Sequence, residues 1–413
     1  MKTVAIAGTF DSKGNEFLFL KESFEEIGIN TFTIHTGTFD PLFTPDVSNN
    51  EIAAEVGEDL PGIVAAKDRA RATAAMSRGV EKIVPRLYRE GKFDGIISLG
   101  GSGGTSIIAP AMRALPVGVP KIIVSTMASG NTQQYVDTSD LILMPSIVDV
   151  SGLNLISIRI FSNAVFAMAG MLEHKITKEI PQKPLVAATM FGVTTPCVEQ
   201  AKAYMESKGY EVLVFHATGT GGKTMESLVR NGYFKGVLDF TTTEWCDELF
   251  GGVLNAGPHR SEAAALCGIP QVVSVGACDM VNFGPWDTVP KEHQNRNLYC
   301  HNPTVTLMRT SVSENDAIGR KLAEKLNMAA GKTALFLPLK GVSMIDAEGQ
   351  PFYGPAEDQA LFDALRQNIN RDTVQLYEMN CLINDKEFAV AAAQKLIEMI
   401  EQEQETPHED HKT

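Results

Sequence analysis

The stretch G-I-I-S-L-G-G-S-G-G-T at residues 95–105 joins a short apolar run to a turn with four glycines, and a helical pattern follows over residues 106–115. An apolar run that ends in a glycine-rich turn and leads into a helix is typical of a buried strand in a parallel sheet. Further strands are predicted at residues 4–8, 31–35 and 121–125, and each ends in a turn rich in Gly, Ser or Thr. Strands that alternate with helices in this way predict an α/β fold with a doubly wound parallel sheet.

The surroundings of this strand recur in the second half of the chain. The pattern L-x-R-x-G-x-F-x-G covers residues 87–95 and, with the same spacing, residues 228–236. Two more pairs of segments keep the same order: I-H-T-G-T at 34–38 with F-H-A-T-G-T at 215–220, and V-P-K-I-I-V at 119–124 with I-P-Q-V-V-S at 269–274. Self-similarity in a fixed order indicates duplication of one structural unit. We therefore predict two Rossmann-like lobes, each with a doubly wound parallel sheet, related by internal duplication.

The segment P-Q-K-P at residues 181–184 separates the two copies, because proline ends the helical stretch predicted over residues 153–176. We place an N-terminal nucleotide-binding lobe at residues 1–180 and a C-terminal lobe, the expected substrate side, at residues 181–413. The C-terminal lobe continues past the repeat with further predicted helices and strands. Its segment 277–303 has little predicted secondary structure, which in a compact domain is typical of a functional loop.

Composition limits the classes of partner. The 413-residue chain has a formal net charge of −14 at pH 7, which argues against a broad nucleic-acid-binding surface. The six cysteines form no C-x-x-C pair, and no apolar stretch approaches the length of about 18 residues that a membrane span needs. The apolar run at the N-terminus is too short for a secretory signal. We expect a cytoplasmic protein without nucleic-acid or membrane partners.

The four glycines of the opening stretch are the strongest binding signal. Their backbone N–H groups can approach an anion with no Cβ in the way, and the positive end of the following helix favours negative charge. Thr105 is expected to cap that helix. We predict phosphate or carboxylate binding by Gly100, Gly101, Ser102, Gly103, Gly104 and Thr105. The alternative is a tight turn between strand and helix with no ligand.

Two neighbouring strand ends are expected to join this site, because ligands lie at the carboxyl ends of parallel strands. The loop after the first strand offers Gly8, Thr9, Asp11 and Lys13, and the loop after the fourth offers Thr126, Ser129, Gly130 and Asn131. Lys13 would offset phosphate charge, and Asp11 would hold Mg²⁺ through water. The alternatives are an N-cap role for Asp11 and a solvated side chain for Lys13.

A second glycine-rich turn, A-T-G-T-G-G-K-T at residues 217–224, satisfies a loose form of the P-loop pattern, with alanine in place of the first glycine. V-L-D at residues 237–239 imitates the acidic strand of P-loop proteins. The turn follows the second strand of its lobe, however, whereas a true P-loop follows the first. We therefore predict anion binding without P-loop architecture by Thr218, Gly219, Gly221, Gly222, Lys223 and Thr224.

Several polar residues of the C-terminal lobe are candidates for catalysis. They are Glu244, Asp247, His259, Asp279 and His301. Carboxylates and histidines near arginines can support acid–base chemistry on an anionic substrate. The alternative is that these side chains form structural ion pairs and helix caps.

The motifs together resemble one known family. V-A-I-A-G-T-F-D-S-K-G-N-E near the start of the chain, T-M-A-S-G-N-T from residue 126 and A-G-P-H-R-S-E-A-A from residue 256 carry a resemblance that covers nearly the whole chain. The chain resembles the ATP-binding N-terminal domain family of the tomato mosaic virus resistance protein, with its bacterial homologues of unassigned function. This implies two Rossmann-like subdomains, a homodimer, and ATP with Mg²⁺ at the first-lobe residues named above. Plant members inhibit viral RNA replication but carry a further C-terminal domain, so we do not transfer that role.

Three hypotheses about function follow. The first is an ATP-binding protein that is also an enzyme for a small carboxylate or sugar acid, with its substrate between the lobes. The second is a nucleotide-gated interaction module without turnover. The third is a sugar-phosphate enzyme that does not use ATP. An enzyme requires the catalytic candidates to converge on the ligand, whereas a nucleotide-gated module requires only the glycine-rich site and a dimer contact.

Overall fold

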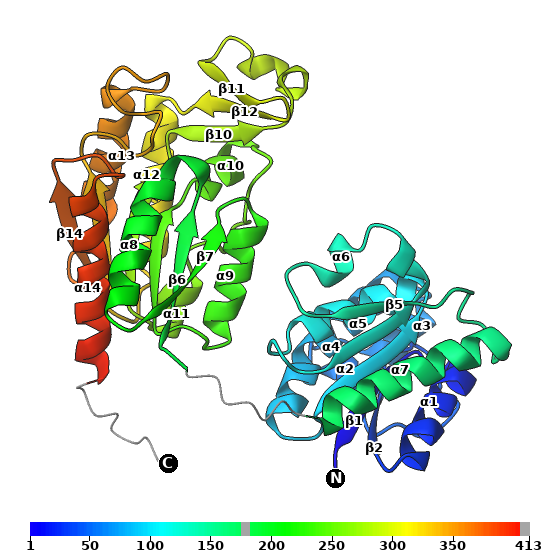
Figure 1. The fold of residues 1–413 in the computed structure, drawn as a ribbon. Coiled ribbons are helices and arrows are strands. Elements are labelled where there is room, and N and C mark those ends of the chain that lie inside the picture. The colour runs from blue at the N-terminus through cyan, green and yellow to red at the C-terminus, as the bar shows by residue number, and fades with distance from the viewer. Residues whose placement is uncertain (175–181, 405–413) are drawn as a thin grey trace. The chain divides into compact units, whose positions relative to one another are not determined.

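The computed structural model describes residues 1–174 and 182–404. They belong to two compact units, Met1–Glu179 (unit 1) and Ile180–Thr413 (unit 2), shown in Figure 1. Each unit has its own parallel sheet and its own hydrophobic clusters. The prediction of an α/β protein with two Rossmann-like parallel sheets is confirmed. The predicted lobe boundary, between residues 180 and 181, lies outside the described residues.

Unit 1 contains a five-stranded parallel sheet in the order β2-β1-β3-β4-β5. Its strands are β1 (Thr3–Gly8), β2 (Asn30–His35), β3 (Gly95–Gly100), β4 (Lys121–Ser125) and β5 (Ile142–Pro145). Its helices are α1 (Gly14–Glu26), α2 (Asn49–Ala54), α3 (Leu60–Ala65), α4 (Arg69–Arg89), α5 (Ser102–Arg113), α6 (Gln133–Val136) and α7 (Leu155–Glu173). Helices α4 and α5 pack on one face of the sheet, and α1 and α7 pack on the other. Both faces are therefore apolar, as a doubly wound sheet requires.

Unit 2 contains a six-stranded parallel sheet in the order β14-β13-β9-β8-β6-β7. Its strands are β6 (Leu185–Met190), β7 (Glu211–His216), β8 (Gly236–Thr241), β9 (Gln271–Gly276), β13 (Thr333–Pro338) and β14 (Val374–Met379). Its helices are α8 (Thr195–Ser207), α9 (Thr220–Arg230), α10 (Glu244–Phe250), α11 (Ala263–Cys267), α12 (Val312–Leu326), α13 (Pro355–Asn368) and α14 (Lys386–Gln404). The extra strands β13 and β14 lie beyond the repeated part and extend the sheet at one edge.

The segment 277–303 is more ordered than predicted. It contains β10 (Met280–Phe283) and β11 (Leu298–Asn302), and β12 (Val305–Arg309) lies between them in an antiparallel sheet. The prediction of little secondary structure was wrong, because strands of four or five residues are too short to show a clear alternation of apolar and polar positions.

The internal duplication is visible in the register of the strands. Val4 on β1 lies opposite Gly95 on β3, and Val186 on β6 lies opposite Gly236 on β8. The repeated glycine of the L-x-R-x-G motif ends the preceding helix in the left-handed region in both copies, with φ of +73° at Gly91 and +76° at Gly232. The same glycine is therefore needed twice for the same helix end.

Helix α7 is long and apolar enough, by length and composition alone, to cross a membrane. The expectation that no stretch approaches that length was therefore wrong, although Arg159 and Asn163 interrupt the run. The helix packs on the unit 1 sheet through Phe161, Val165 and Met168, which is the place of a core helix. Residues 175 and 176 of the predicted helix lie outside the described residues.

Candidate functional site

The carboxyl ends of β1, β3 and β4 lie together at one edge of the unit 1 sheet, because these strands are parallel neighbours. The strand order reverses between β1 and β3, with β2 on one side of this pair and β4 and β5 on the other. Ligands of open parallel sheets bind at such a switch point. The loops after β3 and β4 also approach each other, since a Cβ built on Gly101 would lie 3.7 Å from Thr126 Oγ1.

Helix α5 starts inside the glycine-rich stretch, with Gly101 as its N-cap and Ser102 as its first residue. No side chain of the described residues caps this helix start, whereas α2 and α12 have capping boxes built on Ser48 and Ser311. The first N–H groups of a helix have no partner within the helix. The N–H groups at the start of α5 are therefore available to an anion, and the helix dipole favours negative charge there.

Thr105 does not cap this helix, contrary to the prediction. The helix begins three residues earlier, so Thr105 lies in its first turn and is fully buried. Its hydroxyl donates to the carbonyl oxygen of Gly101 at 2.7 Å and lies 2.7 Å from Ser125 Oγ. Thr105 therefore ties α5 to the end of β4 and is not exposed to a ligand.

The glycines at the start of α5 differ in what surrounds them. A Cβ on Gly100 would lie 3.2 Å from the Cα of Gly104, so close packing explains that glycine. A Cβ on Gly103 would have no atom within 4 Å, and one on Gly104 would meet only the carbonyl oxygen of Leu99, at 3.6 Å. Neither of these two has a positive φ. A glycine within a helix lowers the free energy of unfolding by about 1 kcal/mol relative to alanine. Since neither packing nor backbone conformation requires glycine at 103 and 104, these two glycines have no structural explanation within unit 1.

His35 holds the loop after β1 against the loop after β2. Its buried ring accepts at Nδ1 from the N–H groups of Phe10 (3.1 Å) and Gly37 (3.4 Å). Because Nδ1 accepts, Nε2 carries the proton of the neutral ring and donates to the carbonyl oxygen of Phe39 at 2.9 Å. In the sequence His35 stands out only as part of a repeat, and its bridging role was not predicted. A histidine at the end of a buried strand was the available signal.

Asp11, the predicted magnesium ligand, has one occupied and one free carboxylate oxygen. Oδ2 accepts from the N–H of Phe39 at 3.0 Å, and Oδ1 is buried without a hydrogen-bond partner among the described residues. The alternative N-cap role is wrong, because Lys13 occupies the N-cap position of α1. An unpaired buried carboxylate oxygen leaves a place for a proton donor or a cation.

Lys13 is bonded rather than free in solvent. Its Nζ donates to the carbonyl oxygen of Val150, and the nearby Glu16 accepts from the N–H of Gly152. The segment 150–152 is thereby tied to α1. Lys13 has no carboxylate partner among the described residues, so its positive charge is not neutralised at this edge of the sheet.

The other predicted residues of this edge have ordinary local contacts. Gly8 is explained by packing, since a Cβ there would lie 1.9 Å from the ring of Phe17. The hydroxyl of Thr9 is bonded to that of Ser12 at 3.0 Å. After β4, Thr126–Ser129 forms a short 3-10 turn; Ser129 ends this turn, Gly130 and Asn131 follow it, and all three are exposed.

The second glycine-rich turn already holds a carboxylate that belongs to the chain. Glu244 Oε1 accepts from the N–H groups of Gly219 (2.7 Å) and Gly222 (3.1 Å) at the start of α9. A Cβ on Gly222 would lie 2.2 Å from Glu244 Oε2, and one on Gly221 would lie 1.7 Å from the carbonyl oxygen of His216. These glycines therefore have a structural explanation, and an external anion would have to displace Glu244.

The remaining members of that turn point elsewhere. The hydroxyls of Thr218 and Thr224 donate to the carbonyl oxygens of His216 (3.4 Å) and Thr220 (2.8 Å). Lys223 is exposed and has no ion pair among the residues described. Anion binding from solution by this turn stays a prediction.

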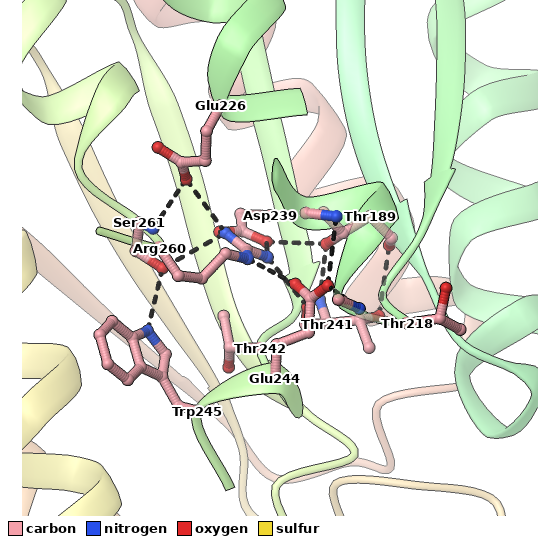
Figure 2. Close-up of polar contacts among 12 residues, drawn as sticks. Thr189, Thr218, Glu226, Asp239, Thr241, Thr242, Glu244, Trp245, Arg260 and Ser261 are labelled. Carbon is pink, nitrogen blue, oxygen red and sulfur yellow. Dashed lines mark hydrogen bonds and ion pairs between the residues drawn. The ribbon is translucent and has the colours of Figure 1, made fainter. Parts of the chain in front are cut away.

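Arg260 lies at the centre of the buried network shown in Figure 2. Its guanidinium donates to both oxygens of Asp239 at 2.6 Å each, and its Nε donates to Glu244 Oε2 at 2.6 Å. A third carboxylate, Glu226, lies 3.4 Å from Nη1. The network joins α9, β8 and α10, and bidentate pairing to a carboxylate is the strongest geometry available to arginine. Asp239, which imitates a P-loop acidic strand in sequence, is thus an arginine partner.

Charge in this network is only partly compensated. Glu226 accepts from the N–H groups of Ser261 and Ala263, both at 2.7 Å. Burial raises the pKa of Glu226 and of Glu244, although the neighbouring Arg260 opposes the rise. The partly exposed Arg230 also lies 3.7 Å from Glu226 Oε2. Arg260 is the buried cation that contacts all three carboxylates, so the network depends strongly on it.

The predicted catalytic carboxylates share no hydrogen-bond partner among the described residues, although Glu244 and Asp247 lie one turn apart on α10 and the charge of Glu244 contributes to raising the pKa of Asp247. Asp247 accepts from the N–H groups of Leu254 and Asn282, each at 2.8 Å, and burial raises its pKa to about 7. Asp279 Oδ2 accepts from the hydroxyl of Ser343 at 2.8 Å, while its buried Oδ1 has no partner among the described residues. Burial raises the pKa of Asp279 to about 6.

The predicted catalytic histidines are both at the surface. His259 pairs with Glu262 at 2.9 Å, and His301 is exposed on β11. Within the described residues, no hydrogen bond or ion pair joins any two of Glu244, Asp247, His259, Asp279 and His301. Their contacts are those expected of structural residues, and a catalytic role for them stays a prediction.

Two family models match nearly the whole chain. The N-terminal domain of the uncharacterised protein family UPF0261 matches residues 2–177, and the C-terminal domain of that family matches residues 183–400. The chain belongs to this family. A UPF0261 protein of Clostridium tetani is 56% identical over 401 residues, which cover 97% of this chain and 99% of that protein.

The plant relative is longer than this UPF0261 chain. The ToMV resistance protein Tm-1(GCR237) of Solanum lycopersicum is 42% identical over 421 residues, covering 95% of this chain and 55% of that protein. The chain thus corresponds to about half of the tomato protein.

Solved structures match over nearly the whole length of this chain, but with low scores. UDP-N-acetylglucosamine 2-epimerase from Rickettsia bellii is 9% identical, with a TM-score of 0.20 over 97% of this chain and 96% of that one. MurG of Acinetobacter baumannii is 12% identical, with a TM-score of 0.21 over 98% of this chain and 100% of that one. Scores this low carry no argument about activity, so the fold assignment rests on the strand order itself.

Proposed function

We propose that this UPF0261 protein binds ATP with Mg²⁺ at the carboxyl edge of the unit 1 sheet. The observation that carries the proposal is the start of α5, where no side chain caps the helix and a Cβ on Gly103 would meet nothing. A phosphate group accepts several N–H bonds at once and is favoured by the helix dipole. Glycines that cost stability and fill no structural need leave room for such a group.

The neighbouring residues fit a magnesium nucleotide. The N–H groups of Ser102, Gly103 and Gly104 would hold a phosphate, and the unpaired charge of Lys13 would act on the same anion. Asp11 Oδ1 has no hydrogen-bond partner in the described part of the chain and is the type of hard oxygen that Mg²⁺ prefers, directly or through water. Bound Mg²⁺ would neutralise part of the charge of the triphosphate.

ATP is chosen over other phosphates because of the resemblance to the ATP-binding domain family, while the geometry supports an anion site in general. Between the hypotheses, the separate contacts of the five catalytic candidates favour a nucleotide-binding module without turnover. A homodimer and a cytoplasmic location, both part of the same prediction, are further proposals.

Isothermal titration with ATP·Mg²⁺ tests the proposal. The double variant Gly103→Val, Gly104→Val places branched side chains where the phosphate would lie, and both Cβ positions have room in the fold. Gly170→Val on α7 is the matched control, because a Cβ there also meets no atom within 4 Å. We expect binding by the wild type and the control, and none by a still-folded double variant.

Two results would contradict the proposal. Absence of ATP binding by the wild type would leave a sugar phosphate or another anion as the ligand. Unchanged binding in the double variant would move the site to the turn at residues 218–224, where ATP would have to displace Glu244.

A further inference from the structure

A depression of about 590 Å³, open to solvent on one side and called the cavity below, lies between α4 and α5 of unit 1. Residues one turn apart on α4 line one wall, and the first turns of α5 line the other. The lining includes Arg69, Thr73, Ala74, Ser77, Ser106 and Ile107. The volume is within the range of about 300–1,000 Å³ typical of small-molecule sites.

The cavity begins where the open start of α5 ends. Ser106 is one helical turn after Ser102, and its hydroxyl donates to the Ser102 carbonyl oxygen at 2.8 Å. One turn of helix is only about 5.4 Å long. Helix α4 also starts at this edge, because a helix that connects parallel strands runs back from the carboxyl end of one to the amino end of the next. A ligand held at the start of α5 therefore reaches the cavity without crossing the sheet.

The chemistry of the lining suits a nucleoside better than a phosphate. Ala74 and Ile107 offer small apolar surfaces against which a planar base can lie. The hydroxyls of Thr73 and Ser106 donate to helix carbonyl oxygens, so their oxygens can accept from a ribose or a base edge, and the hydroxyl of Ser77 lines the same space. Arg69 has no ion pair among the described residues, and its guanidinium can stack on a base or pair with a phosphate. A triphosphate alone would leave most of this volume empty.

We propose that this cavity takes the nucleoside of a nucleotide whose phosphates bind at the start of α5, an inference that rests on the proposed function. The site then reads the two parts of the ligand on different elements. Backbone N–H groups of α5 bind the phosphates. Side chains of α4 contact the base, so a ligand with a base binds more tightly than one without.

The test compares ATP with inorganic tripolyphosphate, each with Mg²⁺, by isothermal titration. Ala74 is exposed, so Ala74→Phe fills the cavity without entering the core. Ala167→Phe on α7 is the matched control, since Ala167 is also an exposed helical residue of unit 1. We expect Ala74→Phe to lower the affinity for ATP on the order of tenfold and to leave the affinity for tripolyphosphate unchanged. The control should change neither. Ser77→Phe, which enters the same cavity from the next turn, provides a second variant if Ala74→Phe is unstable.

The outcomes separate the two proposals. If Ala74→Phe leaves ATP binding unchanged, or weakens both ligands equally, the nucleoside does not lie in the cavity. Equal affinity of the wild type for ATP and tripolyphosphate would overturn the inference in the same way, while the phosphate site stands. If the wild type binds neither ligand, the proposed function itself is wrong.

Discussion

The helices α5 and α9 both begin in a glycine-rich turn, but they differ in what binds their first N–H groups. Each of these turns follows a strand of a duplicated parallel sheet. At α9 the N–H groups of Gly219 and Gly222 bind Glu244, which is fixed by Arg260. At α5 no side chain within residues 1–174 and 182–404 binds the first N–H groups, and the Cβ positions of Gly103 and Gly104 have room. A helix start that favours an anion can thus be satisfied by the chain or left for a ligand, and only the contacts reveal which.

Arg260→Leu is expected to have the largest effect, because it removes the central positive charge from three buried carboxylates. Breaking a buried ion pair on one side costs about 3–5 kcal/mol. Both tryptophans, Trp245 and Trp286, lie in unit 2, so urea unfolding followed by tryptophan fluorescence reports on this unit. Arg320→Leu, in an exposed pair with Asp316, is the control and should leave the midpoint nearly unchanged. Equal effects of both substitutions on the midpoint would show that the Arg260 network does not stabilise unit 2.

Glu244→Ala is expected to convert α9 into an open helix start. The variant leaves the N–H groups of Gly219 and Gly222 without their acceptor, and we expect a loss of about 2–3 kcal/mol in the free energy of unfolding of unit 2. Sulfate should restore part of that loss, compared with chloride at equal ionic strength, because it can take the place of the carboxylate. The wild type provides the control for the general effect of sulfate. If sulfate helps the wild type as much as the variant, α9 is not an anion site even when emptied.

Unit 2 should also depend on pH through its buried carboxylates. The folded state keeps the proton of Asp279 up to about pH 6, whereas the unfolded chain loses it near the ordinary pKa of 3.8. Between these values the folded state binds more protons, so its stability falls as pH rises. Asp279→Asn removes this dependence. From pH 4.5 to 7.5 the wild type should lose about 2 kcal/mol more than the variant. Parallel pH profiles in urea unfolding would contradict the assignment.

Gly103→Ala is expected to have the smallest effect and to separate stability from binding. The added Cβ meets no atom within 4 Å, so the variant should gain about 0.5–1 kcal/mol in unit 1 from helix propensity. It should also weaken ATP, because the methyl group stands where the phosphate approaches. Gly170→Ala on α7 should give a similar gain by calorimetry with no change in ATP affinity. A gain without weaker binding would mean that the open space serves no ligand.

Much of the fold could be predicted from the sequence, since apolar runs that end in glycine mark both strand ends and turns. Strand β4 (Lys121–Ser125) was predicted with its observed bounds. The antiparallel strands after β9 were missed, because sequences such as M-V-N-F at 280–283 and L-Y-C-H-N at 298–302 form neither a continuous apolar run, as β4 does, nor a clear alternation. The start of α5 was placed one turn late, because glycine has a low helix propensity even where, as at Gly103, it forms the first turn of a helix.

The binding signals were less predictable for a physical reason. The glycine patterns at residues 100–105 and 217–224 identify two helix starts that favour anions, but a pattern of glycines does not say what fills the space. The group that fills the second, Glu244, lies more than twenty residues away and is aimed by Arg260. Such a contact depends on which elements the fold brings together, so it cannot be predicted from the local sequence.

The carboxylate at the start of α9 is part of the chain, so its presence does not depend on any concentration in solution, as that of a dissolved ligand does. A group built into the chain stabilises the folded state in any solution. A ligand taken from solution does so only in proportion to the logarithm of its concentration, about 2.7 kcal/mol at a hundredfold excess over Kd. If the proposed function is correct, the stability of unit 2 does not depend on the concentration of ATP, whereas the stability of unit 1 rises with it. Where proteases remove unfolded chains, the abundance of the protein would then report on cellular energy supply.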